Sequence, residues 1–137
     1  MKNKIRTPLA GQKLAVLATS NADQPHCSLI VFMIDQDQSE LLFITDRHSL
    51  KYTNLIRNPK VSLLIDTRPA ADRSFNNAVA VTLVGEAEEI VGDRRGVLLD
   101  RFIEQHPGMR RFAEDPNQAL IKVRIIQSTS NTFPGNE

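Results

Sequence analysis

Short apolar segments separated by polar turns dominate the chain. Residues 14–20 and 28–34 are apolar runs joined by residues 21–25, a connector rich in turn-forming residues. We expect these two runs to be strands of one hairpin. After a polar loop, the apolar run of residues 41–45 is placed to return antiparallel to the second strand.

The second half of the chain holds three further strand patterns. Residues 61–65 and 79–84 are rich in β-branched and aliphatic side chains. Gly85 predicts a bulge, after which residues 86–91 continue the strand. Residues 120–126 alternate between apolar and other positions, which predicts a strand with one buried face.

The remaining regular elements are expected to be helices. The first has apolar residues at helical spacing, begins at the N-cap Ser49 and ends at the Asn-Pro pair of residues 58–59. The second begins at Asp93, its expected N-cap, and ends at the His-Pro-Gly break of residues 106–108. A short third helix is expected around Met109.

Short connections between strands, with few intervening helices, exclude a doubly wound α/β sheet and favour a closed or partly closed antiparallel barrel. The 137 residues, 41% of them hydrophobic, fit a single domain, residues 1–137. The chain has neither a G-x-G-x-x-G pattern nor a P-loop. Residues 66–77 are expected to be a functional or mobile loop, and residues 128–137 to be a loosely ordered tail.

Charge and composition exclude several classes of partner. The net charge is +1 with both signs interspersed, which argues against nucleic acid or an acidic membrane as the main partner. No run is long enough to span a bilayer, and we expect a cytoplasmic protein. One cysteine and three scattered histidines predict no disulfide and no metal site. His26 and Cys27 are neighbours on a strand, so they point to opposite faces and are not expected to form a nucleophilic pair.

Residues 45–51, Thr-Asp-Arg-His-Ser-Leu-Lys, carry the clearest chemistry in the chain. They lie between a strand and a helix start, where unpaired N–H groups and the helix dipole favour an anion. Arg47 and Lys51 add two cations where the dipole prefers negative charge, so a bound anion would relieve that repulsion. We predict a phosphorylated small molecule here. The alternative is an ordinary N-cap at Ser49 beside solvated cations, and His48 is expected to be solvated rather than a phosphate ligand.

Three blocks, LAVLATSNADQPHCSLIVF, LLFITDRHSLKYTNLIRNPKVSLLI and VAVTLVGEAEEI, occur in an order and spacing that resembles the flavin-binding split-barrel family typified by pyridoxamine 5'-phosphate oxidase. The resemblance covers about residues 14–126. It implies a mainly β fold, a six-stranded antiparallel split barrel that binds FMN at a homodimer interface. By resemblance the phosphate would be held around Thr45, Arg47, Ser49, Leu50 and Lys51. The flavin ring would lie along the backbone of Ser28, Leu29, Ile30 and Val31.

The sequence also departs from the family's pattern. Oxidases of pyridoxamine phosphate carry an arginine where this chain has Ser28, and they have a basic C-terminal segment that grips the substrate phosphate. Pyridoxamine-phosphate oxidase activity itself is therefore not expected, whereas flavin binding is. No catalytic side chain is assigned, because a bound flavin carries out the redox chemistry.

Three functions agree with the sequence. The first is an FMN-dependent oxidoreductase acting on an unidentified small molecule. The second is a related protein that uses a deazaflavin or binds haem, and the third is a non-catalytic flavin-binding module. We expect a homodimer because a barrel this small offers only a shallow face for the ring. Lys122 or Arg124 is a candidate for reaching the partner's cofactor.

Overall fold

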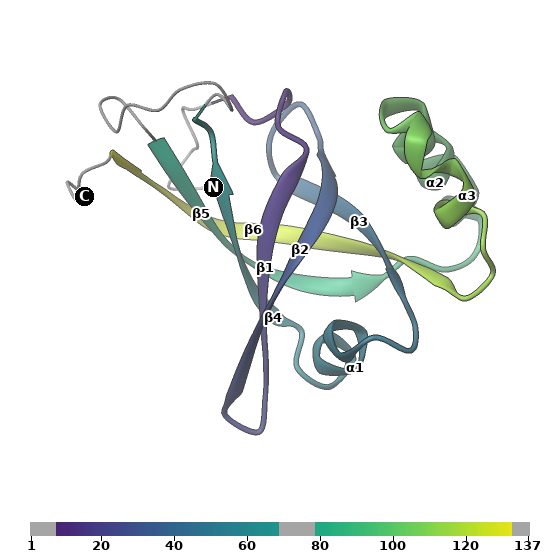
Figure 1. Ribbon diagram of the computed structural model, residues 1–137, viewed down its shortest axis with the longest axis horizontal. Coiled ribbons are helices and arrows are strands. Elements are labelled where there is room, and N and C mark those ends of the chain that lie inside the picture. The colour runs from purple at the N-terminus through teal and green to yellow at the C-terminus, as the bar shows by residue number, and fades with distance from the viewer. Residues whose placement is uncertain (1–7, 69–78, 133–137) are drawn as a thin grey trace.

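The computed structural model describes residues 8–68 and 79–132. These residues form six strands, three α-helices and one 3-10 turn (Figure 1). The strands are β1 (Leu14–Asn21), β2 (Gln24–Ile34), β3 (Glu40–Asp46), β4 (Lys60–Asp66), β5 (Val79–Glu89) and β6 (Gln118–Thr132). The helices are α1 (Leu50–Arg57), α2 (Asp93–Gln105) and α3 (Arg110–Ala113), with the 3-10 turn η1 (Pro107–Met109) before α3.

The strands form a closed antiparallel barrel in the order β1-β2-β3-β6-β5-β4. This confirms the predicted fold class. Figure 1 shows α1 across one end of the barrel and α2 with α3 on its outer side. Among the described residues, no helix has the length and apolar character needed to cross a membrane.

The β1–β2 hairpin turns tightly at two residues. Ala22 and Asp23 both have positive φ angles, 51° and 63°, the backbone that a two-residue turn needs to match the twist of its strands. The register pairs Asn21 with Gln24. Strand β2 therefore begins at Gln24, four residues before the predicted start, because the tight turn lets the backbone pair at once.

Strand β3 is buried on both faces. Leu41 and Phe43 point into the barrel core, whereas Leu42 and Ile44 join a second apolar cluster outside the barrel with Leu120, Phe102 and Ile103. A strand covered by the barrel core on one side and by α2 on the other must be apolar at successive positions. This is the reason that the run of residues 41–45 lacks the alternation of the other strands.

Gly85 marks a bulge, as predicted. The β5–β6 register shifts between Val84 and Gly85, and a Cβ at Gly85 would collide with the carbonyl oxygen of Arg124. Only glycine allows the two backbones to approach this closely.

Two sequence predictions were wrong. Residues 128–132 belong to β6 and are not a loose tail, because they pair with the first half of β5 from Leu83 to Val79. The N-cap of α2 is Gly92, with a φ of 77°, and Asp93 is the first helical residue. Residues 69–77 of the predicted loop and residues 133–137 of the predicted tail lie outside the described part of the chain.

Candidate cofactor site at the start of α1

The turn between β3 and α1 is held by its own hydrogen bonds. The Asp46 carboxylate accepts from the His48 N–H at 2.7 Å, and the Asp46 carbonyl accepts from the Ser49 N–H at 3.0 Å. Ser49 Oγ accepts from the Tyr52 N–H at 3.3 Å, so Ser49 is the N-cap, as predicted. It also donates to the Asp46 carbonyl at 2.7 Å, which leaves Thr45 Oγ1 to donate to Ser49 Oγ at 3.0 Å. The turn is therefore an ordered platform.

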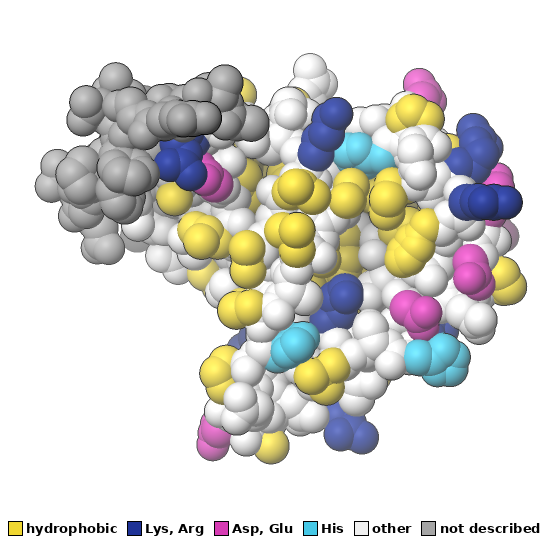
Figure 2. Space-filling view, viewed as in Figure 1, with side chains coloured by type: hydrophobic (Ala, Val, Ile, Leu, Met, Phe, Trp, Pro, Cys, Tyr) yellow, Lys and Arg dark blue, Asp and Glu magenta, His cyan; other side chains and the backbone are white. Residues whose placement is uncertain are grey.

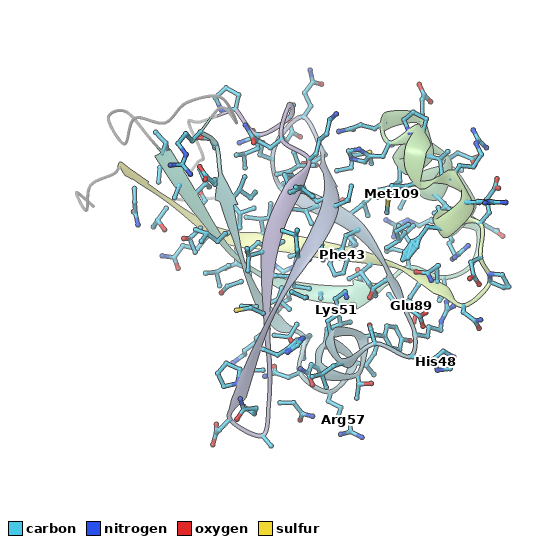
Figure 3. All side chains as sticks on the ribbon, viewed as in Figure 1. Phe43, His48, Lys51, Arg57, Glu89 and Met109 are labelled. Atoms are coloured by element: carbon cyan, nitrogen blue, oxygen red, sulfur yellow. The ribbon has the colours of Figure 1, made fainter. Side chains whose placement is uncertain are left out.

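Lys51 is the cation that this turn presents. The residue is half-buried in the first turn of α1, which contains no acidic residue. Within residues 8–68 and 79–132 its ammonium group has no hydrogen bond or ion pair. Figure 3 shows the Lys51 side chain pointing from α1 toward the strands, whereas exposed His48 points outward. The helix dipole and this ammonium group together form a positive site.

Arg47, the second predicted cation, points to a different part of the chain. One of its terminal nitrogens, Nη1, donates to the carbonyl oxygens of Pro116 and Gln118, each at 2.9 Å. The other, Nη2, lies 2.6 Å from Glu89 Oε2. The structure thus joins Thr45 to Ser49 just before the helix turn that carries Lys51, but it directs the Arg47 guanidinium toward β5 and β6.

Glu89 and Tyr52 complete a charged cluster that the sequence did not reveal. The Tyr52 hydroxyl donates to Glu89 Oε1 at 2.6 Å. Burial acts to raise the pKa of Glu89, but hydrogen bonds from Tyr52 and Arg47 outweigh it and hold that pKa below its usual value. The hydrogen bonds to Glu89 raise the pKa of Arg47 and of Tyr52. Glu89 stands 38 residues beyond Lys51, and no local pattern in its strand marks it.

The strand predicted to line the flavin ring alternates between two faces. Ser28 and Ile30 lie on the face of β2 that is directed into the barrel, and Leu29 and Val31 lie on the outer face. Leu29 is 64% exposed, and Val31 packs beside the α2 cluster. Ser28 Oγ is buried and has no hydrogen-bond partner within the described part of the chain. Ser28 lies on the face of β2 opposite Leu29 and Val31, so its hydroxyl is directed away from the proposed ring surface.

An apolar row crosses the outer face of three neighbouring strands. Val16 on β1 pairs with Leu29 on β2 and with Leu64 on β4, and both leucines are exposed. Figure 2 shows hydrophobic side chains gathered on the face where β1 and β2 lie. A cavity of about 510 Å³ opens beside Leu29, lined also by residues 11–16 and 66–68. The site therefore has a charged end at α1 and an apolar surface along the strands.

The histidine and cysteine side chains outside this site either have structural roles or are separated from one another. His106 caps α2, as predicted, and its Nε2 lies 2.8 Å from the Phe32 carbonyl oxygen. Cys27 is exposed on the outer face of β2, and His26 lies on the opposite face, as predicted. The residues that the structure describes contain no group of three or more His, Cys, Asp or Glu that could hold a metal ion.

The two basic residues of β6 are paired within the chain. Lys122 Nζ lies 3.0 Å from Glu88 and 3.4 Å from Glu40, and Arg124 lies 2.6 Å from Glu86. An approach of either residue to a partner's cofactor would have to break these ion pairs.

A six-stranded antiparallel barrel with a cationic helix start at the end of its third strand defines a split-barrel protein. Residues 1–130 match the family described as pyridoxamine 5'-phosphate oxidase, and the chain belongs to this family. No curated protein matches the chain.

Solved structures share the fold. A protein of unknown function from Agrobacterium tumefaciens superposes with a TM-score of 0.79 at 22% identity, over 90% of this chain and 52% of its own. This chain thus spans about half of that protein. General Stress Protein 26 from Bacillus anthracis has a TM-score of 0.67 and 28% identity, with coverage of 88% and 84%. A FAD-binding protein from Mesorhizobium loti has a TM-score of 0.69 and 19% identity, with coverage of 89% and 85%.

The similar structures include proteins that are named for different cofactors. Besides the FAD-binding protein, they include a heme binding protein from Mycobacterium smegmatis and an F420 reductase. FAD, F420 and heme thus all occur in the names of proteins of this fold.

Proposed function

We propose that the protein binds FMN and acts as an FMN-dependent oxidoreductase on a small molecule. The observation that carries this proposal is Lys51, a half-buried cation at a helix start that has no acidic residue in its first turn. A ligand with a dianionic phosphate would neutralise both the ammonium group and the helix dipole.

The phosphate end of the cofactor would be held by the platform before α1. The first N–H groups of a helix have no intrahelical carbonyl partner, so those of Leu50 and Lys51 are available to phosphate oxygens. The Lys51 ammonium group supplies the charge. Ser49 and Thr45, whose hydroxyls bond to each other, fix the position of these donors.

The ring end would lie along β2. Leu29 and Val31 offer an apolar surface on the outer face of β2. Such an apolar surface suits one face of an aromatic ring. Bound FMN would supply the redox chemistry, and the chain would orient the ring and exclude water from one of its faces.

A homodimer with one FMN per chain completes the proposal. The row of Leu64, Val16 and Leu29 is a contiguous apolar surface on the side where the ring would lie. A second copy related by twofold symmetry would cover this row and bury two equivalent cofactors. The cytoplasm stays the predicted location.

A titration of the apo-protein with FMN and riboflavin, followed by flavin fluorescence, tests the proposal. We expect tighter binding of FMN, since riboflavin lacks the phosphate. Equal affinities for FMN and riboflavin would show that the protein does not recognise the phosphate. Preferential uptake of a deazaflavin, or a Soret band after addition of haem, would favour the second candidate. Bound FMN that no nicotinamide donor or small-molecule substrate reduces would favour a non-catalytic flavin module.

A further inference from the structure

Glu89 holds two parts of the segment that carries the proposed phosphate site. This residue ends β5, and its side chain is only 16% exposed. Glu89 Oε1 accepts from the Tyr52 hydroxyl of α1, and Oε2 accepts from Arg47 of the preceding turn, each at 2.6 Å. One carboxylate therefore fixes both the turn before α1 and the first half of the helix itself.

Arg47 extends this link to a further part of the barrel. Its backbone N–H donates to the Asn117 carbonyl at 3.0 Å, and its guanidinium donates to the carbonyls of Pro116 and Gln118. The Gln118 carbonyl also accepts from Arg95 of α2 at 3.0 Å. Arg47 thus connects the turn to the segment that leads into β6, and its two terminal nitrogens are committed to partners within the chain.

We propose that Glu89 is a positioning residue for the cofactor phosphate, and that Arg47 supports the site without contacting the phosphate. Through Arg47 and Tyr52, Glu89 holds the turn so that the N–H groups of Leu50 and Lys51 and the Lys51 ammonium group meet the ligand without further ordering. A site held in its binding geometry loses less entropy on binding. This inference rests on the proposed function.

The charges of the cluster support this assignment. Arg47 neutralises Glu89, so the pair adds no net charge beside the anion site. Lys51 is left as the uncompensated cation of residues 45–51 within the described part of the chain. If Arg47 turned toward a phosphate, the mostly buried Glu89 carboxylate would lose its ion pair and keep, among the described residues, only Tyr52 as a hydrogen-bond partner. Leaving a buried carboxylate without its cation is costly, and the observed pairing is therefore retained when the ligand binds.

The substitution Glu89→Gln separates the two possible roles of Arg47. If Glu89 positions the site, we expect Glu89→Gln to weaken FMN binding by about tenfold or more, the effect of losing a hydrogen bond to a charged group. Riboflavin binding, measured in the same titration, is expected to change less than about twofold, because the ring surface on β2 is untouched. If Arg47 contacts the phosphate directly, Glu89→Gln frees the guanidinium, and FMN binds equally well or more tightly. That outcome would overturn the inference.

A double-mutant cycle gives an independent test. Arg47→Met and Glu89→Gln both remove the Arg47–Glu89 ion pair. The double variant is therefore expected to have about the same FMN affinity as the single variant that binds FMN less tightly. Additive losses would show that the two residues act separately and would contradict the inference. Tyr52→Phe removes only the hydroxyl that bonds to Glu89 and should produce a smaller loss in the same direction.

A neighbouring residue provides the control. Glu88→Gln removes an adjacent carboxylate that pairs with Lys122 on β6, and it should leave the preference for FMN over riboflavin unchanged. A parent protein that binds FMN and riboflavin equally would overturn the proposed function and this inference with it. A parent that prefers FMN, with a Glu89→Gln variant that keeps the same preference, would overturn this inference alone.

Discussion

Asn54 Nδ2 donates a hydrogen bond to Thr19 Oγ1 over 3.1 Å, and both side chains are buried. This contact joins α1 to β1 beside Leu55, which belongs to the barrel core. The helix that presents the proposed phosphate site is therefore fixed by a buried polar contact as well as by apolar packing.

Replacing Thr19 with valine should destabilise the protein. The change leaves the buried Asn54 amide without its acceptor, and we expect a loss of about 1 to 3 kcal/mol in the free energy of unfolding. Chemical denaturation followed by circular dichroism measures it. Thr82→Val is the control, because Thr82 is a half-buried threonine with no side-chain hydrogen bond in the described part of the chain. Equal losses in the two variants would contradict the role given to the Asn54 contact.

Replacing Lys51 with alanine should weaken FMN binding by about 1.5 to 3 kcal/mol, the range for a hydrogen bond to a charged group, without unfolding the barrel. Isothermal titration calorimetry of the apo-protein gives this value. Arg57→Ala removes an exposed cation from the last turn of the same helix and should leave the affinity nearly unchanged. A Lys51→Ala variant that binds FMN as well as the parent would show that Lys51 is only a solvated helix residue.

The stability of the protein should fall in acid, with Glu89 as one cause. The pKa of Glu89 is lower in the folded protein than in the unfolded chain. Glu89 therefore stabilises the fold above the unfolded pKa of about 4.3, and this contribution is lost as the pH falls through the folded value. Glu89→Gln should flatten the dependence of the unfolding free energy on pH below about pH 5, measured by urea denaturation. An unchanged slope would contradict the pairing of Glu89.

Two glycines should respond in opposite directions to the same substitution. Gly85→Ala places a Cβ against the backbone of Arg124 and should destabilise the protein by about 1 to 3 kcal/mol. Gly96 lies within α2, where an added Cβ meets open space, so Gly96→Ala should stabilise it by about 0.5 to 1 kcal/mol. Thermal denaturation of both variants is a direct test. A Gly85→Ala variant as stable as the parent would show that the bulge can relax.

The proposed homodimer should depend on the apolar row. Leu29→Glu introduces a charge beside Val16 and Leu64, and we expect this variant to be monomeric and to lose most of its FMN. Val97→Glu changes an exposed apolar residue on α2, away from the row, and should leave both properties intact. Light scattering combined with a flavin count decides the matter. A monomeric parent that keeps full FMN occupancy at low micromolar concentration would exclude a shared site.

The strands were predictable from the sequence because each one leaves a local pattern. Gly85 predicted the bulge in β5, and Ser49 predicted the start of α1. The extension of β6 to Thr132 left no comparable signal, since polar residues 127–132 are strand only through their pairing with β5. The partners of Arg47 were also beyond prediction. Glu89 and Pro116 lie 42 and 69 residues away in sequence, and only barrel closure brings them to the turn.

Strand β3 is covered on both faces; residues 41–43 pair with both β2 and β6, and residues 44–46, which lead into the turn, pair with β6. Its amide protons can reach solvent only when the barrel core and the α2 cluster open together, so they should be among the slowest to exchange with deuterium. The turn that follows Asp46 is tied directly to this slowly opening strand. The proposed phosphate platform should therefore keep its shape during the local openings that expose the hairpin tip, and it should be lost only when the whole fold is lost.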